Sequence, residues 1–367
     1  GIRSVGLEAN PVAHFAARAK SRWDIDPEEL LVGAKKIARI AAAEIRASLG
    51  SATELPLFAK PASQERPHFR RLRPELEKLI LADSICPLPL HKSLILIEHL
   101  RKSALRYREH LLLAMAKALV STISNLHFGP EVGVRGLKED VDVVEAWLRE
   151  VEIIAGDLRN LAGKSDTAAE IHLADARSAS AYIEPKSVSA IITSPPYPNE
   201  KDYTRATRLE GVLLGFIRSK EDLRVTKKSL VRSNTRSVYV ADDDDKWIAD
   251  VPEVARIADT IEQRRIELGK TSGFERQYHR VTKLYFGGMA RHLAELRKVL
   301  KPGAQLAYVV GDQASYLRVM IRTGQILAQI AEKWGYRVNG IDLFRTRMAT
   351  ASKEQLREEV VVLEWKG

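Results

Sequence analysis

The sequence of 367 residues contains a single cysteine, Cys86, and only 6% aromatic residues. One cysteine excludes an internal disulfide framework and any zinc site built from cysteines, and it is typical of proteins of a reducing compartment. No apolar run approaches the ~18 residues of a membrane-spanning helix, and the first residues do not have the pattern of a signal peptide. We therefore expect a cytoplasmic protein, with Cys86 as an ordinary buried thiol.

Metal-ligand patterns are also lacking. The nine histidines show no paired spacing such as H-E-x-x-H. The acidic run Asp242–Asp245 could imitate a cation site, but no glycine-hinged ligand loop follows it. We interpret this run as a solvated acidic loop and expect no metal.

What the sequence has in excess is positive charge. It contains 58 Lys and Arg against 48 Asp and Glu, a formal net charge of +10, and 45% of its residues are hydrophobic. The chain is long enough for about two domains with a sizeable core. The charge makes a polyanionic partner plausible without naming one.

The first half of the chain has an almost entirely helical pattern. Apolar residues recur at helical spacing over Leu30–Leu49, over His91–Ser124 for some nine turns without a break, and over Asp140–Leu161. The segment Glu54–Pro74 is rich in proline and arginine and is expected to be an irregular connector. These patterns predict an all-helical region over residues 23–165.

The remaining segments alternate strands with helices, which predicts an α/β fold with a mostly parallel sheet. The continuous apolar run Val188–Thr193 is typical of a strand covered on both faces. A polar segment, residues 219–282, should contain one helix, Val254–Leu268. The other expected elements are strands Arg3–Glu8, Glu170–Ala174 and Gln305–Val310, an antiparallel closing pair Arg337–Phe344 and Glu359–Glu364, and helices His14–Lys20, Leu284–Leu300 and Thr323–Trp334.

These patterns predict a division into three parts. The sheet domain would be assembled from residues 1–22, 166–218 and 283–367. Residues 23–165 would form a large helical insertion, and residues 219–282 a second insertion.

The tetrapeptide Ser194-Pro195-Pro196-Tyr197 directly follows the expected strand Val188–Thr193. Consecutive prolines fix φ and remove two N–H donors, so the turn is stiff and its carbonyl oxygens point outward. A serine hydroxyl beside a rigid carbonyl can clamp an amino group, and a tyrosine ring can stack on a planar base. Holding both N–H bonds of an aromatic amine in a pyramidal geometry restores its lone pair for attack on an electrophilic methyl group. The alternative is a polyproline turn without a chemical role.

Two carboxylates end other expected strands, Glu8 and Asp175. Ligands of open α/β sheets bind outside the carboxyl ends of the strands, and a carboxylate there can accept hydrogen bonds from a ribose. Each acid alone could equally be a solvated loop residue or a helix cap. Together, in order along one sheet, they indicate a cofactor that carries a nucleoside.

The segment AIITSPPYPNEKDYTR resembles the catalytic motif of S-adenosylmethionine-dependent DNA amino-methyltransferases, whose T-S-P-P-Y form is commonest among cytosine-N4 enzymes. VGLEANPVAHFAARAK and HLADAR resemble that family's second and third strand segments. The resemblance implies a Rossmann-like methyltransferase sheet in which Glu8, beside Asn10, binds the cofactor ribose and Asp175, beside Ala176, faces the adenine. LRKVLKPGAQLAYVVGDQ and the closing strands also resemble the family.

One departure from the family concerns the glycine-rich loop of the F-x-G-x-G type, which follows the first strand and holds the methionine part of the cofactor. In this motif order the loop should lie just upstream of Gly1, and no later G-x-G replaces it. We expect an N-terminally truncated sequence; the alternative is that another polypeptide supplies the strand.

The resemblance implies methyl transfer from S-adenosylmethionine to an exocyclic amino group of a base flipped out of duplex DNA, with cytosine N4 favoured. The alternatives are an adenine-N6 or RNA amino-methyltransferase, or a nucleic-acid-binding subunit that has lost catalysis. Covalent C5 chemistry is not expected, because the place of its nucleophilic cysteine is occupied by the Ser194–Tyr197 turn. A cognate restriction or defence-system protein is a possible partner.

Lys201, Tyr203 and Arg205 follow the Ser194–Tyr197 turn directly and are the favoured DNA-contact residues. Residues 219–282 are the candidate target-recognition region. Three further basic stretches are either phosphate-contact surfaces or solvated faces: Arg66–Arg73, Arg218–Arg236 and Arg264–Arg280.

Overall fold

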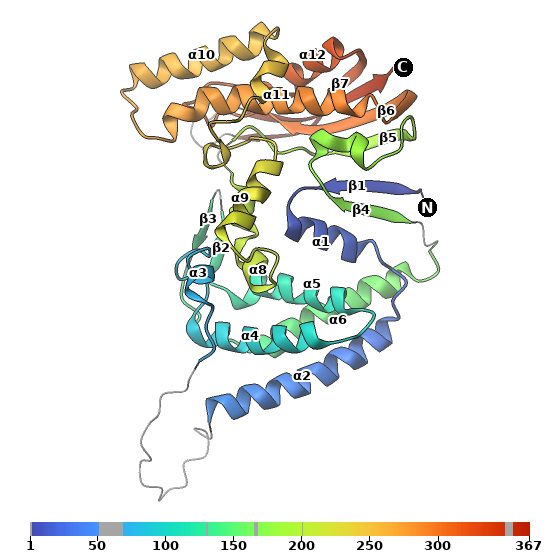
Figure 1. Ribbon diagram of the computed structural model, residues 1–367, viewed down its shortest axis with the longest axis vertical. Helices are drawn as coiled ribbons and strands as arrows, with labels where there is room; N and C mark the ends of the chain where they lie inside the picture. The colour runs from blue at the N-terminus through green and yellow to red at the C-terminus, as the bar shows by residue number, and fades with distance from the viewer. Residues whose placement is uncertain (1, 51–68, 130, 165–167, 200, 349–354) are drawn as a thin grey trace, which may run out of the picture. The chain divides into compact units, whose positions relative to one another are not determined.

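The computed structural model describes residues 2–50, 69–129, 131–164, 168–199, 201–348 and 355–367 (Figure 1). It divides into two compact units, each assembled from separate segments. The helical unit comprises Gly1–Gly6, Asn10–Ile171 and Tyr203–Val225. The sheet unit comprises Leu7–Ala9, His172–Asp202 and Thr226–Gly367. The three-part division expected from the sequence stays a prediction.

The helical unit is built from amphipathic helices whose starts are marked by proline in the first turn and by capping side chains. Asn10 caps α1 (Pro11–Lys20), Asp26 caps α2 (Pro27–Leu49) and Asp142 caps α6 (Val143–Leu161). The other elements are α3 (Pro74–Glu77), α4 (Pro87–Lys102), α5 (Arg108–Ala118), the π-helical turn η1 (Leu119–Ile123), the hairpin β2 (Leu126–Phe128) and β3 (Val132–Val134), α7 (Tyr203–Ala206) and α8 (Arg208–Leu213).

The core of the helical unit lies between α2, α4, α5 and α6 (Figure 1). Trp147 is fully buried there, and its indole N–H donates to the Leu111 carbonyl at 3.0 Å. The buried ring therefore keeps its hydrogen bond while it fills the space between helices.

The expectation of one unbroken helix over His91–Ser124 is wrong. The chain leaves α4 at Ser103, which has an extended backbone, and its hydroxyl accepts from the Leu105 amide at 3.3 Å. Serine competes with the helix by offering the backbone this local bond, so the apolar spacing continues across a break.

The sheet unit contains a four-stranded sheet of order β5-β6-β8-β7. β5 (Val188–Thr193) runs parallel to β6 (Leu300–Gly311), whereas β8 (Gln355–Trp365) is antiparallel to both β6 and β7 (Tyr336–Met348). The antiparallel closing pair is confirmed. The sheet as a whole is mixed rather than mostly parallel, so the chain is a mixed α/β protein.

A second sheet pairs β1 (Ser4–Glu8) with β4 (Ala169–Leu173). The Ser4 amide donates to Ala168 at one end, and the Ala174 amide donates to Glu8 at the other, at 3.1 Å. Both strands therefore run in the same direction, and both were expected from the sequence.

β5 does not have the double cover that its apolar sequence predicts. Ile192 is 85% exposed, and Ala190 is also exposed. Within the described residues β5 is an edge strand whose one hydrogen-bonded neighbour is β6. A central position therefore cannot be read from β-branched composition alone.

Helices α10 (Pro252–Glu267), α11 (Tyr278–Leu296) and α12 (Thr323–Lys333) pack in the sheet unit, and α12 lies against β6, β7 and β8 (Figure 1). α11 ends four residues earlier than expected, because Leu300 already belongs to β6. The remaining elements are α9 (Lys220–Ser229), which the sequence analysis missed, and the 3-10 turns η2 (Ala176–Ala181), η3 (Thr235–Ser237), η4 (Asp244–Ile248) and η5 (Glu275–Gln277).

Gly287 and Gly288 lie inside α11, where glycine weakens a helix. A Cβ on Gly287 would lie 1.9 Å from the Asp244 carbonyl oxygen. The absence of a side chain therefore lets η4 pack directly on the helix.

No helix in the described part of the chain is long and apolar enough to cross a membrane. Among the same residues, no group of three or more His, Cys, Asp or Glu side chains is arranged to hold a metal ion.

Candidate active site

The Ser194–Tyr197 turn begins at the carboxyl end of β5, where Thr193 lies in register with Tyr308 of β6. Ser194 is exposed, and the residues from Pro195 to Tyr197 are half-buried. The Asn199 amide donates back to the Tyr197 carbonyl at 2.8 Å. The turn is therefore fixed at both ends, with its serine facing outward.

The Tyr197 ring lies against Gly311, the last residue of β6. A Cβ on Gly311 would lie 3.0 Å from Tyr197 Cε2 and 3.4 Å from Glu358 Cγ. The ring is thus seated beside a backbone that only glycine leaves open. Sequence reasoning did not assign Gly311 to the site, although a glycine ending a strand is the signal that could have identified it.

Glu8 and Asp175 lie at the carboxyl ends of two neighbouring parallel strands. The expectation of one sheet that also includes the strand before the Ser194–Tyr197 turn is wrong for the described residues, in which β1 and β4 form a sheet separate from that of β5. The bond from the Ala174 amide to the Glu8 carbonyl holds these ends together. Both residues belong to the sheet unit, together with Ala176, the Ser194–Tyr197 turn and Lys201.

The carboxylate of Asp175 is already engaged by an arginine. It caps η2 by accepting from the Arg177 amide at 2.8 Å, and it forms an ion pair with the Arg177 guanidinium at 2.7 Å. Arg177 also binds Asp244, and both of these side chains are buried. Burial disfavours the charged arginine, but Asp175 and Asp244 together raise its pKa. Asp175 is therefore held and oriented by a buried cation.

The interpretation of Asp242–Asp245 as a solvated loop is wrong for two of its four residues. Asp244 is buried against Arg177 and Arg291, and Asp242 forms a bidentate pair with Arg232 at 2.8 Å. Asp243 and Asp245 are exposed. The arginines come from distant parts of the sequence, so the acidic run itself gives no sign of them.

A buried histidine connects the Asp175–Ala176 segment to β6. His292 Nδ1 lies 2.9 Å from the Ala176 carbonyl oxygen, and Nε2 lies 2.9 Å from the Tyr308 hydroxyl. Because a carbonyl only accepts, Nδ1 carries the proton and Nε2 accepts from the tyrosine. Burial lowers the pKa of His292, so the ring is neutral.

Three of the residues expected at the site belong to the helical unit. Asn10 caps α1, accepting from Val12 at 3.0 Å, and donates to the Thr207 hydroxyl at 3.0 Å. Tyr203 is 43% exposed, and Arg205 lies 3.5 Å from Glu131. The structure therefore groups Lys201 with the Ser194–Tyr197 turn in one unit, and Tyr203 and Arg205 with the other.

The basic stretches are not uniform surfaces. In the first, residues 66–68 lie outside the described part, and Arg70 forms ion pairs with Glu44 and Glu98. In the second, Arg232 is buried on Asp242 and is not available to a phosphate. In the third, Arg265 pairs with Glu262.

Cys86 is half-buried rather than buried. It lies at the start of α4, and Asn125 donates to its sulfur at 3.4 Å.

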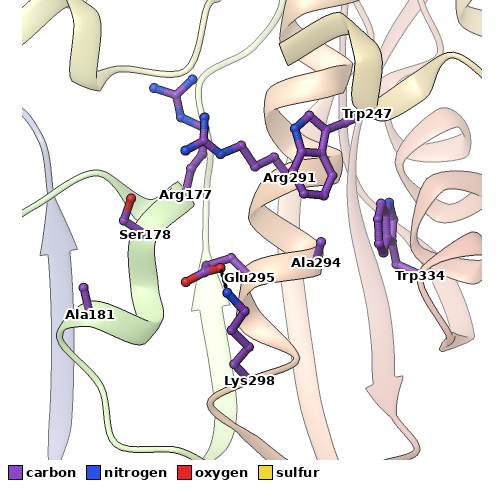
Figure 2. Close-up of a pocket in the computed structure, with 9 residues that line it drawn as sticks. All are labelled: Arg177, Ser178, Ala181, Trp247, Arg291, Ala294, Glu295, Lys298 and Trp334. Carbon is purple, nitrogen blue, oxygen red and sulfur yellow. Dashed lines mark hydrogen bonds and ion pairs between the residues drawn. The ribbon is translucent and has the colours of Figure 1, made fainter. Parts of the chain in front are cut away.

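A cavity of about 440 Å³ lies on α11, beside η2, η4 and the end of α12 (Figure 2). Its two tryptophan rings are 5.4 Å apart, and its cations are bound to carboxylates. None of the residues expected at the site lines it, so it is separate from the Ser194–Tyr197 turn. The lining residues are Arg177, Ser178, Ala181, Trp247, Arg291, Ala294, Glu295, Lys298 and Trp334.

No protein-family model matches the chain, and no solved structure matches it. The chain is similar to proteins named Type II methyltransferase M.AvaI from Nostoc sp. and from Anabaena variabilis, with 33% identity over 190 residues to each. These matches cover 47% of this chain and 37% of each relative, so the chain spans little more than a third of their length.

A longer match is to the Type II methyltransferase M.BsoBI of Geobacillus stearothermophilus. The identity is 24% over 383 residues, which cover 96% of this chain and 72% of that protein.

Proposed function

We propose that this chain transfers a methyl group from S-adenosylmethionine to an exocyclic amino group of a base flipped out of duplex DNA. The observation that carries the proposal is the Ser194–Tyr197 turn at the carboxyl end of β5, with its tyrosine seated on Gly311. The similarity to proteins named Type II methyltransferases supports the same class of reaction. Cytosine N4 is the favoured acceptor, because the turn resembles the T-S-P-P-Y motif that is commonest among cytosine-N4 enzymes.

The donor set fits the cofactor. Glu8 and Asp175 place carboxylates at the ends of adjacent strands, where ribose hydroxyls and an adenine amino group need acceptors, and Arg177 orients the carboxylate of Asp175. We assign Glu8 to the ribose and Asp175 to the adenine, with Asn10 and Ala176 beside them. When bound, the cofactor supplies an electrophilic methyl group on a sulfonium.

The turn supplies positioning. The Ser194 hydroxyl and the Pro195 carbonyl accept hydrogen bonds from the two N–H groups of the target amine. Pro196 keeps the backbone stiff without adding a donor. The Tyr197 ring stacks on the extruded base. Lys201, Tyr203 and Arg205 are assigned to the DNA backbone. We place this reaction in the cytoplasm, as part of a restriction–modification system with a cognate restriction or defence-system protein as a possible partner.

The test compares Ser194→Ala and Tyr197→Ala with Ser189→Ala, an exposed serine of the same strand. Each protein is incubated with S-adenosylmethionine and duplex DNA, and the digested nucleosides are analysed by mass spectrometry. Loss of one preorganised hydrogen bond at a reacting group lowers the rate about 10²- to 10³-fold, so we expect that loss in Ser194→Ala and none in the control.

Unchanged methylation in both site variants would refute the assignment. N6-methyladenine in place of N4-methylcytosine would change the base, and product only on RNA would change the substrate. DNA binding by a parent protein that neither methylates DNA nor binds S-adenosylmethionine in calorimetry would favour the non-catalytic subunit.

A further inference from the structure

The end of β6 is surrounded by arginines that none of the expected DNA-contact stretches contains. Gly311 lies in register with Glu358 of β8, and Glu358 lies in register with Arg345 of β7. A Cβ on Gly311 would contact the side chains of both Tyr197 and Glu358. A row across the sheet therefore leads from the catalytic tyrosine to the arginines of the β7–β8 hairpin.

Glu358 holds two guanidinium groups at once. Its side chain is only 8% exposed; one carboxylate oxygen binds Arg345 Nε, and the other lies 3.5 Å from Arg347 Nε. The two arginine side chains are 66% and 41% exposed. The Nε atoms of both guanidiniums face Glu358, and Arg347 Nη2 also lies 3.4 Å from the Asp312 carbonyl oxygen.

The local charge is positive beside the tyrosine. Two guanidiniums share one carboxylate, which leaves an excess of one positive charge. Arg345 is also close enough to Tyr197 for the phenol to influence it electrostatically. The register of β7 against β8 shifts between Leu343 and Arg345, so that Phe344 is an extra residue in β7. Phe344 is 64% exposed, and the Arg345 guanidinium lies 5.9 Å from its ring centroid.

We propose that Arg345 and Arg347, held by Glu358, bind the backbone phosphates that flank the flipped base. The proposal rests on the function proposed above. A nucleotide stacked on Tyr197 must pass its sugar–phosphate backbone over the rim of the site, and the two arginines line that rim. Guanidinium groups bind phosphate oxygens in a bidentate manner, and holding them in advance reduces the entropy lost on binding.

The alternative is that these arginines bind only Glu358, in ion pairs that hold the β7–β8 hairpin and contact no phosphate. The opposite end of the same hairpin provides the control. Arg337 pairs with Glu364 there and is 55% exposed, so it is an ion-paired arginine on the same two strands.

The experiment measures the dissociation constant of the full chain for duplex DNA between 50 and 300 mM salt. Each phosphate contact contributes a slope of about 0.9 to the logarithmic salt dependence. We expect Arg345→Ala/Arg347→Ala to lose a slope of about 2, and Arg337→Ala to lose none. Arg345→Lys/Arg347→Lys should keep the slope, because the charge remains, while affinity falls with the loss of the bidentate geometry.

An unchanged slope in the double alanine variant would overturn the proposal, as would an equal loss in Arg337→Ala. If the double alanine variant does not fold, a reduced slope in the folded lysine variant would overturn it. Failure of the proposed function has a different signature: the parent protein binds duplex DNA with its full salt dependence but transfers no methyl group.

Discussion

The two units treat charged side chains differently. In the helical unit several ion pairs lie at or near the surface: Arg70 and Glu44 are 38% and 37% exposed, and Arg18 and Glu109 are 49% and 21% exposed. In the sheet unit several pairs are buried, including Arg177–Asp244, Arg232–Asp242 and Lys227–Asp202. A surface pair contributes little to stability, whereas a buried charge that loses its partner is strongly destabilising.

The helical unit has its own buried carboxyl group, and it is neutralised in another way. Glu210 is 6% exposed, and its Oε2 has no hydrogen-bond partner among the described residues. Burial raises its pKa to about 7. The sheet unit thus compensates buried acids with arginines, and the helical unit compensates this one with a proton. The first arrangement fixes the Asp175 side chain at the candidate cofactor site.

The largest expected effect comes from removing the buried cation of the sheet unit. Arg177→Ala leaves Asp175 and Asp244 without their shared partner. Breaking a buried pair in this way lowers the free energy of unfolding by about 3–5 kcal/mol. Denaturant unfolding, followed by circular dichroism, measures the change.

Arg70→Ala is the matched control in the helical unit, because Arg70 also joins two acids. The expected loss there is below about 1 kcal/mol. Equal losses in both variants would remove the distinction between the two units.

The second prediction concerns the pH dependence that Glu210 gives to the helical unit. Its pKa is about 7 in the folded chain and 4.5 for an ordinary glutamate, so the folded state binds an extra proton between these values. Stability is therefore greatest below about pH 4.5 and is lost as pH rises towards about 7, by roughly 3 kcal/mol in total.

Glu210→Gln should abolish this part of the dependence. Unfolding of the parent and the variant is compared at pH 5 and pH 8. A variant whose stability falls as steeply as that of the parent would show that another group titrates.

The third and smallest effect tests the seat of Tyr197 at the end of β6. In Gly311→Ala the new methyl group would lie 3.0 Å from the ring. Overpacking of this kind lowers stability by about 1–3 kcal/mol, and the displaced ring should also reduce methylation of duplex DNA.

Gly340→Ala is the control in the same sheet, because its nearest atom would be 3.8 Å away. Full methylation by Gly311→Ala would show that the position of the ring does not matter to the reaction.

Most elements could be predicted because their signals are local. The strands β1, β4 and β5 and the helices α2, α6 and α12 follow from apolar spacing, capping residues and glycine. The break between α4 and α5 could not, since it depends on one serine bond inside a continuing apolar pattern. α9 is strongly polar, with no buried residue, so no hydrophobic spacing marks it.

The candidate site divides in the same way. The Ser194–Tyr197 turn is contiguous, so the hypothesis about its chemistry comes directly from the sequence. Gly311, Glu358 and Arg345 are brought together only by the register of β6, β8 and β7. Likewise, the partners of Asp175 and Asp244 meet through packing of η2, η4 and α11.

The exposed edge of β5 has a consequence for the behaviour of the protein in solution. Among the described residues one side of β5 has no strand partner, so its backbone N–H and C=O groups can pair with another extended chain, and the exposed Ile192 adds apolar surface beside them. Such an edge is a template for self-association. The protein should therefore self-associate at a lower concentration than a net charge of +10 alone would imply.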